Sequence, residues 1–196
     1  TATEGLVSRA ASELGGPITC LVNNASIFEP DTLTNADADS WNRHFQTNLR
    51  APFILLQQLA AQGVPPTIDE NGEPVAEVLA INMIDQRVLK PNPDFMTYTL
   101  AKSALLTLTK TAAQALAPAI RVNAIGPGPT LKGERQTTDE FTQQRQATVL
   151  HRGTNFCDIN AALDFFLHAP AATGQMLCVD GGQHLTWKTT DVLCDR

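Results

Sequence analysis

Two kinds of hydrophobic pattern alternate along the chain. Short apolar runs rich in β-branched residues are typical of strands that are buried on both faces. They cover residues 18–26, 76–84, 120–128 and 174–182. Longer segments with a helical period separate them and cover residues 3–14, 39–63, 96–117 and 158–170. This alternation predicts an α/β fold with a doubly wound parallel sheet, in a single domain over residues 1–196.

Glycine and proline mark the expected ends of these elements. In the helix at 39–63, Asp39 or Ser40 is a plausible cap and Gly63 a plausible stop. Pro52 lies inside this helix, so a kink or a break is expected there. Segments without a regular pattern are expected to be loops or variable regions, and they cover residues 29–38, 64–75 and 130–156.

Composition narrows the class of protein. The 196 residues are 43% hydrophobic and 17% charged, which is typical of a soluble globular protein. The net charge of −6 argues against a nucleic-acid or membrane-surface partner. The four cysteines and four histidines have no metal-ligand spacing, so no metal site is expected. No signal peptide or apolar run of bilayer length is visible, and a cytoplasmic protein in a reducing compartment is expected.

Polar residues follow each predicted strand. They are "NNAS" at 23–26, "MIDQ" at 83–86, "GPGPT" at 126–130 and "DGG" at 180–182. In a doubly wound sheet, ligands bind in the crevice at the carboxyl ends of the strands. These segments are therefore the expected lining of a small-molecule site.

Tyr98 and Lys102 are the candidate catalytic pair. They lie at positions i and i+4 of a predicted helix, and so share one face. A lysine ammonium near a tyrosine hydroxyl favours the phenolate and lowers its pKa, so that the tyrosine can exchange a proton near neutral pH. Taken alone, the spacing is also compatible with a chance pair on a solvated helix.

Five segments in a fixed order carry a family resemblance. They are "LVNNAS", "QTNLRAPF", "YTLAKSAL", "IRVNAIGPGPT" and "TGQMLCVDGG", which together span residues 1 to about 185. With them the chain resembles the short-chain dehydrogenase/reductase family. The resemblance implies a Rossmann-like fold and an NAD(P)-dependent oxidoreductase that acts on a small molecule.

The resemblance also implies roles for individual residues. Tyr98 would be the catalytic acid, Lys102 would lower its pKa and hold the nicotinamide ribose, and Asn48 would position a water in a proton relay. Further cofactor contacts would come from Asn23, Ala25, Ser26, Pro127, Gly128 and Thr130. Each has a structural alternative: the asparagines could satisfy backbone groups, and Gly126 to Gly128 could form an ordinary turn.

The chain departs from the family pattern at its start. The glycine-rich loop TGxxxGxG, which cradles a pyrophosphate at a helix N-terminus, is absent together with its strand and the next two. On the order of two βα units, roughly 60 residues, would hold them, and the intact protein is expected to have them. The residues that select between NADH and NADPH in this family lie in that absent segment. NADP is the expected cofactor, and NAD stays an alternative.

A second departure concerns the substrate. Thirteen residues before Tyr98, where the family usually has a serine, stands Asp85. An acid there is the pattern of pteridine reductases, and Phe28, two residues after Ser26, matches their pterin-stacking phenylalanine. Asp85 could supply or relay a proton to a pterin nitrogen while Phe28 stacks on the ring. Alternatively, Asp85 caps a turn and Phe28 anchors a loop.

Three functions therefore stay open. The leading hypothesis is an NADPH-dependent reductase of a dihydropteridine or folate-type substrate. The second is a general NAD(P)-dependent carbonyl reductase or alcohol dehydrogenase, and the third a non-catalytic binding or scaffold protein. The helices at 39–63 and 96–117 are apolar on more than one face, which predicts a homo-oligomer, either a dimer or a tetramer.

Overall fold

Four parallel strands form the central sheet of the computed structural model, which describes residues 3–187. Their order across the sheet is β1 (Cys20–Asn23), β4 (Val78–Met83), β5 (Ile120–Pro127) and β6 (Met176–Val179). Every neighbouring pair is parallel. All four carboxyl ends therefore lie at the same edge of the sheet, as the prediction of a doubly wound sheet requires.

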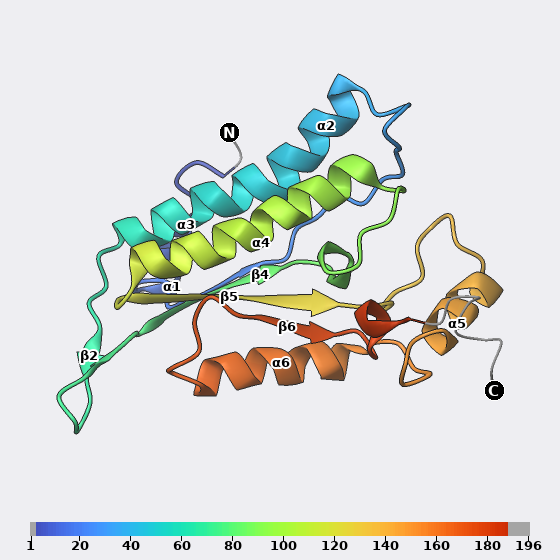
Figure 1. Ribbon diagram of the computed structural model, residues 1–196. Helices are drawn as coiled ribbons and strands as arrows, with labels where there is room; N and C mark the ends of the chain where they lie inside the picture. Colours follow the sequence, from blue (N-terminus) through green and yellow to red (C-terminus); the bar gives the residue numbers. More distant parts are fainter. Residues whose placement is uncertain (1–2, 188–196) are drawn as a thin grey trace.

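Helices cover both faces of this sheet (Figure 1). Helix α3 (Ala51–Ala61) and helix α4 (Met96–Leu116) run side by side over one face, and α6 (Phe156–His168) lies on the other. Helix α1 (Leu6–Leu14) packs against α3, and α2 (Ala38–Phe45) packs against α4. The predicted α/β fold is confirmed.

The apolar core lies on both sides of β4 and β5. On one side Leu56 and Leu59 pack with Val122, and on the other Phe166 packs with Ile81. These side chains are at most 4% exposed, which is why the strands read as continuous apolar runs. This packing on both faces fixes the position of β4 and β5, and with it the place where their carboxyl ends lie.

The first strand is less buried than its sequence predicts. Cys20 and Val22 are exposed in β1, whereas Leu21 packs against the core. Among residues 3–187, β1 pairs only with β4, and α6 packs against β5 and β6. The expectation of a fully buried strand at 18–26 was therefore wrong, because one face of this edge strand is left uncovered.

The predicted helix at 39–63 has three parts. Helix α2 is capped by Asp37, whose carboxylate accepts a hydrogen bond from the Ser40 amide at 2.8 Å. A π-helical turn (Gln46–Arg50) joins it to α3. The backbone stays helical through this turn, and Pro52 lies in the first turn of α3, where its missing N–H is tolerated. The expected break at Pro52 is thus replaced by a π-helical turn before it.

Two segments without a sequence pattern contain short regular elements. Residues 64–75 form a hairpin of β2 (Thr67–Ile68) and β3 (Pro74–Val75), which projects from the body of the molecule in Figure 1. Residues 130–156 contain α5 (Thr138–Gln146), whose start is a capping box. Short 3₁₀ turns follow β4 and β6 at Gln86–Val88 (η2) and Gln183–Leu185 (η3). No helix within residues 3–187 is long and apolar enough to cross a membrane.

Candidate active site

Asp85 lies at the centre of the polar side chains beyond β4. One of its carboxylate oxygens accepts a hydrogen bond from the Arg87 amide at 2.8 Å, and so caps η2. The other accepts a hydrogen bond from the Tyr98 hydroxyl at 2.9 Å. Asp85 can therefore cap the turn and also act as a proton donor or relay. Each role uses a different oxygen of the same carboxylate.

The environment of Tyr98 holds its proton firmly. The side chain is 5% exposed, and burial raises the pKa of Tyr98 well above its ordinary value. The Asp85 carboxylate raises this pKa further through its charge and its hydrogen bond, whereas the Arg87 guanidinium opposes them. The expectation that Lys102 lowers the pKa of Tyr98 is not met here, because burial and Asp85 dominate. Tyr98 is thus set up as a neutral hydroxyl.

Lys102 is buried one helical turn after Tyr98. Its ammonium donates a hydrogen bond to the Met83 carbonyl at the end of β4, at 2.8 Å. Burial lowers the pKa of Lys102 from 10.5 to about 8, although the Asp85 carboxylate acts in the opposite direction. An ammonium has three donors, and one is bonded to the Met83 carbonyl. Within residues 3–187 the other two donors have no hydrogen-bond partner.

Phe28 belongs to a cluster of stacked side chains. It stacks on Phe95 with the ring centroids 4.1 Å apart, and meets the edge of the Tyr98 ring at 4.7 Å. The Arg87 guanidinium lies 5.6 Å from the Phe28 centroid and 5.0 Å from the Phe95 centroid. Phe28 is still 51% exposed, so it has surface to offer an aromatic ligand.

Asn48 fixes the loop that carries Phe28. It lies in the π-helical turn and is fully buried. Its side-chain oxygen accepts hydrogen bonds from the Ile27 amide and the Ser26 hydroxyl, and its amide donates to the Ile27 carbonyl. Asn48 thus positions the segment next to Phe28, and its part in a proton relay stays a prediction.

Asn23 begins a buried polar chain across the sheet. Its amide donates to the Asn82 side-chain oxygen at 2.8 Å, and the Asn82 amide donates to Thr109 at 2.9 Å. The side-chain oxygen of Asn23 is buried and has no hydrogen-bond partner. This acceptor fits a hydroxyl donor such as a ribose. Ala25, two residues further on, is exposed, and contacts of Asn23, Ala25 and Ser26 with a cofactor stay a prediction.

The residues after β5 are used within the protein. Gly128 donates its amide to the Val179 carbonyl and to the Thr154 hydroxyl, at 3.2 and 3.1 Å. A Cβ on Gly128 would lie 2.6 Å from the Cα of Asp180, so close packing requires this glycine. Thr130 donates to the Gly128 carbonyl at 3.0 Å. Contacts of Pro127, Gly128 and Thr130 with a cofactor stay a prediction, and the Gly128 amide has no free donor for them.

Sequence reasoning missed the group that holds the start of α4. The Asp31 carboxylate accepts hydrogen bonds from the Thr97 amide and hydroxyl and from Ser40. Burial alone would raise the pKa of Asp31, but these hydrogen bonds outweigh it and lower the pKa. His44, fully buried, accepts from the Glu29 amide and donates to Thr97 at 2.8 Å. Asp31 stands in a polar loop 66 residues before Thr97, so no local pattern could have revealed it.

Phe95 and Arg87 were missed as well. Phe95 precedes α4 with a φ of 58°, a left-handed conformation that is uncommon outside glycine. Neither residue has a spacing that would single it out in the sequence. A separate cleft of about 430 Å³ lies beside this site, lined by Glu29, Pro30, Asp31, Asn35, Asp37, Asp39, Ser40, Arg43 and Arg135. It contains none of the predicted site residues, and no metal-ligating cluster occurs within residues 3–187.

Comparison with known proteins places the chain in one family. The chain belongs to the short-chain dehydrogenase/reductase family, because the family model described as enoyl-(acyl carrier protein) reductase matches residues 1–184. Pteridine reductase 1 of Leishmania tarentolae is 29% identical over 184 residues, which cover 85% of this chain and 63% of that protein. The chain thus spans less than two thirds of that relative.

Two solved structures are more similar. FolM alternative dihydrofolate reductase 1 from Brucella suis, in complex with NADP, is 45% identical with a TM-score of 0.86. That alignment covers 95% of this chain and 72% of the other. The protein of the same name from Brucella canis, also complexed with NADP, is 43% identical with a TM-score of 0.85, over 97% and 72% of the two chains.

Proposed function

We propose that this protein is an NADPH-dependent reductase of a dihydropteridine or dihydrofolate-type substrate. The observation that carries the proposal is the hydrogen bond between the Tyr98 hydroxyl and the Asp85 carboxylate, 2.9 Å long. It joins an acid, at the position where the family usually has a serine, to the tyrosine of the Tyr-x-x-x-Lys motif. Similarity to a pteridine reductase and to two dihydrofolate reductases supports the same substrate class.

The site contains the proton donors that reduction of a C=N bond requires. Such a reduction adds a hydride to the carbon and a proton to the nitrogen. Tyr98 donates that proton from its hydroxyl, which is protonated at neutral pH. Asp85, bonded to the same hydroxyl, passes a replacement proton to Tyr98 from solvent. A high tyrosine pKa opposes the reverse reaction, which needs a phenolate as the base.

The residues at the sheet edge fit a nicotinamide dinucleotide. Two donors of the Lys102 ammonium and the buried, unpartnered oxygen of Asn23 are suited to ribose hydroxyls. The bound cofactor supplies the hydride. We propose NADP(H), since both FolM structures contain NADP, with NAD as the alternative. Asn48 and Ser26 keep the Phe28 loop in place while the substrate stacks on it.

An NADPH-oxidation assay on the natural full-length protein tests the proposal. Dihydrofolate, dihydrobiopterin and a panel of ketones are compared at equal concentration, and the reduced pterin is identified by chromatography. We expect turnover of at least one of the two pterins and little turnover of ketones. Turnover of ketones alone would establish a general carbonyl reductase. If NADPH is not oxidised with any of these substrates, the proposal is contradicted.

We further propose a homo-oligomer, a dimer or a tetramer, that forms through the outer faces of α3 and α4. Phe53 of α3 and Leu100 of α4 are 46% and 43% exposed, on helices that already cover the sheet with another face. Light scattering at micromolar concentration should therefore detect a species larger than the monomer. A stable monomer at that concentration would contradict this proposal.

A further inference from the structure

Arg87 lies beside the candidate active site and has no counter-ion among the residues that the structure describes. It lies in η2, two residues after Asp85, and its guanidinium rests against the Phe28 and Phe95 rings at 5.6 and 5.0 Å. Its one side-chain hydrogen bond runs to the Asn92 oxygen at 2.7 Å. Within residues 3–187 it forms no ion pair, whereas Arg43 pairs with Glu29 and Arg152 with Asp158.

The guanidinium is also incompletely hydrogen-bonded. Its Nε is buried and has no partner. A buried donor without an acceptor is costly, and partial removal of a charge from water adds to that cost. Contacts with two aromatic rings offset only part of it, because a cation–π contact is weaker than an ion pair with good geometry. No carboxylate within residues 3–187 pairs with this guanidinium, so it can pair with the anion of a ligand.

Neighbouring residues hold Arg87 in this place. The oxygen of Asn92 accepts hydrogen bonds from both the Arg87 guanidinium and the Asp94 amide, so one side chain orients the arginine and the turn before α4. Phe95 keeps its ring under the guanidinium although its backbone is in the left-handed region, with φ at 58°. Strained non-glycine residues cluster at functional sites, where the surrounding structure maintains them.

We infer that Arg87 binds a carboxylate of the substrate, and that the site favours dihydrofolate-type substrates over pterins with an uncharged side chain. This inference rests on the proposed function. Dihydrofolate carries a glutamate beyond its pterin, and so presents carboxylates for a guanidinium fork. Dihydrobiopterin has the same pterin but no anionic group.

Steady-state kinetics on the natural full-length protein test the inference. Wild type, Arg87→Met and Arg87→Lys are compared with dihydrofolate and with dihydrobiopterin, and Lys110→Met, on the exposed surface of α4, controls for the loss of one positive charge. We expect Arg87→Met to raise the KM for dihydrofolate about 10- to 100-fold, the range for a lost charge-assisted contact. The KM for dihydrobiopterin should rise far less, and Arg87→Lys should recover part of the loss for dihydrofolate.

Other outcomes separate this inference from the proposed function. Equal KM changes for both substrates would reduce Arg87 to a packing residue, and a raised KM for NADPH would assign it to a cofactor anion. A wild type that reduces dihydrobiopterin and does not bind dihydrofolate in calorimetry would overturn the inference while the proposed function stands. A wild type that neither binds nor reduces either pterin would overturn both. Thermal melting of each variant verifies that it is folded.

Discussion

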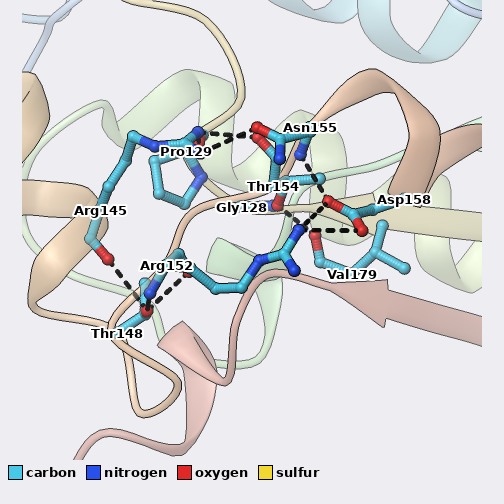
Figure 2. A network of polar contacts seen from close by, with 9 residues as sticks. All are labelled: Gly128, Pro129, Arg145, Thr148, Arg152, Thr154, Asn155, Asp158 and Val179. Atoms are coloured by element: carbon cyan, nitrogen blue, oxygen red, sulfur yellow. Dashed lines mark hydrogen bonds and ion pairs between the residues drawn. The ribbon is translucent and has the colours of Figure 1, made fainter.

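Two polar clusters lie at the same edge of the sheet, and they differ in how far their hydrogen bonds are satisfied. Beyond β5 and β6, Arg145 donates to the Pro129 and Thr154 carbonyls at 2.8 Å and to Asn155 at 2.9 Å, and Arg152 pairs with Asp158 (Figure 2). Beyond β1 and β4, buried atoms lack partners. They are the side-chain oxygens of Asn23 and Gln86, the Thr99 hydroxyl and the Arg87 Nε.

This difference separates a structural cluster from a candidate ligand-binding one. Buried polar groups in folded proteins are nearly always paired, because an unpaired group loses its bond to water and gains nothing in return. Arg145 donates its hydrogen bonds to the Pro129 and Thr154 carbonyls, and so holds the two ends of the segment 129–155 together. The residues beyond β1 and β4 retain unused donors and acceptors, and one of them, Arg87, lies against the Phe28 and Phe95 rings. A ligand can satisfy these groups.

The largest effect is expected for Asp85→Asn. Asparagine can still accept the Arg87 amide and so keep the cap of η2, but it cannot relay an acidic proton to Tyr98. We expect kcat for dihydropteridine reduction to fall about 100-fold or more. The affinity for NADPH should change little.

Asp85→Ser is the matched control, because it restores the residue usual in the family. It should lose pterin reduction and gain at most weak ketone reduction. Wild-type kcat in the asparagine variant would remove Asp85 from the proton path and leave it as a turn cap.

The second prediction concerns the buried charge of Lys102. The unfolded chain keeps the lysine proton up to about pH 10.5, whereas the folded protein loses it near the pKa of about 8. Between these values the unfolded state binds more protons, so the contribution of Lys102 to the free energy of unfolding rises with pH. Relative to Lys102→Met, which does not titrate here, wild type should gain up to about 3 kcal/mol across this window.

Urea unfolding of the two proteins at several pH values measures this gain. Below pH 8 the difference between them should be constant, since Lys102 is charged in both states. A difference that stays constant from pH 7 to 10.5 would mean that the Lys102 ammonium is solvated. The pKa of Lys102 in the folded protein would then be close to its ordinary value.

The third prediction addresses the satisfied cluster. Arg145→Met leaves the Pro129 and Thr154 carbonyls without their donor, and should lower the free energy of unfolding by about 2–3 kcal/mol. Arg152→Met is the control: it removes an exposed ion pair with Asp158, which is worth less than about 1 kcal/mol. Chemical denaturation measures both. Equal losses would show that the Arg145 cluster does not stabilise its loops more than a surface pair does.

The order of the elements could be predicted from the sequence because burial leaves a strong local pattern. β4 and β5 are covered on both faces and give unbroken apolar runs, and α4 was placed almost to the residue. The exposure of β1 could not be predicted in this way. It depends on which strand and helix lie beside it, and a run of apolar letters does not contain that information.

The candidate site was predictable only where a motif carries it. Tyr98, Lys102 and Asp85 stand at fixed spacings, and their proximity in the structure agrees with that pattern. Asp31, Phe95 and Arg87 act through contacts made by folding, so their letters look ordinary. The pKa of Tyr98 was misjudged for the same reason: the motif predicts a nearby lysine, but burial is a property of the whole fold.

The smallest effect is expected for Phe28→Ala. Stacking on a flat ring acts in the ground state and in the transition state alike, so its loss raises KM and leaves kcat nearly unchanged. An aromatic contact is worth about 0.5–1.5 kcal/mol, so the KM for a dihydropteridine should rise about 2- to 10-fold. Phe165→Ala, a change of equal size at a residue 52% exposed on α6, should leave KM unaltered. Because Phe28 also packs on Phe95 and Arg87, the thermal midpoint of both variants must be measured. An unchanged KM in a folded Phe28→Ala variant would mean that Phe28 only anchors its loop, and that the candidate active site binds its substrate without this ring.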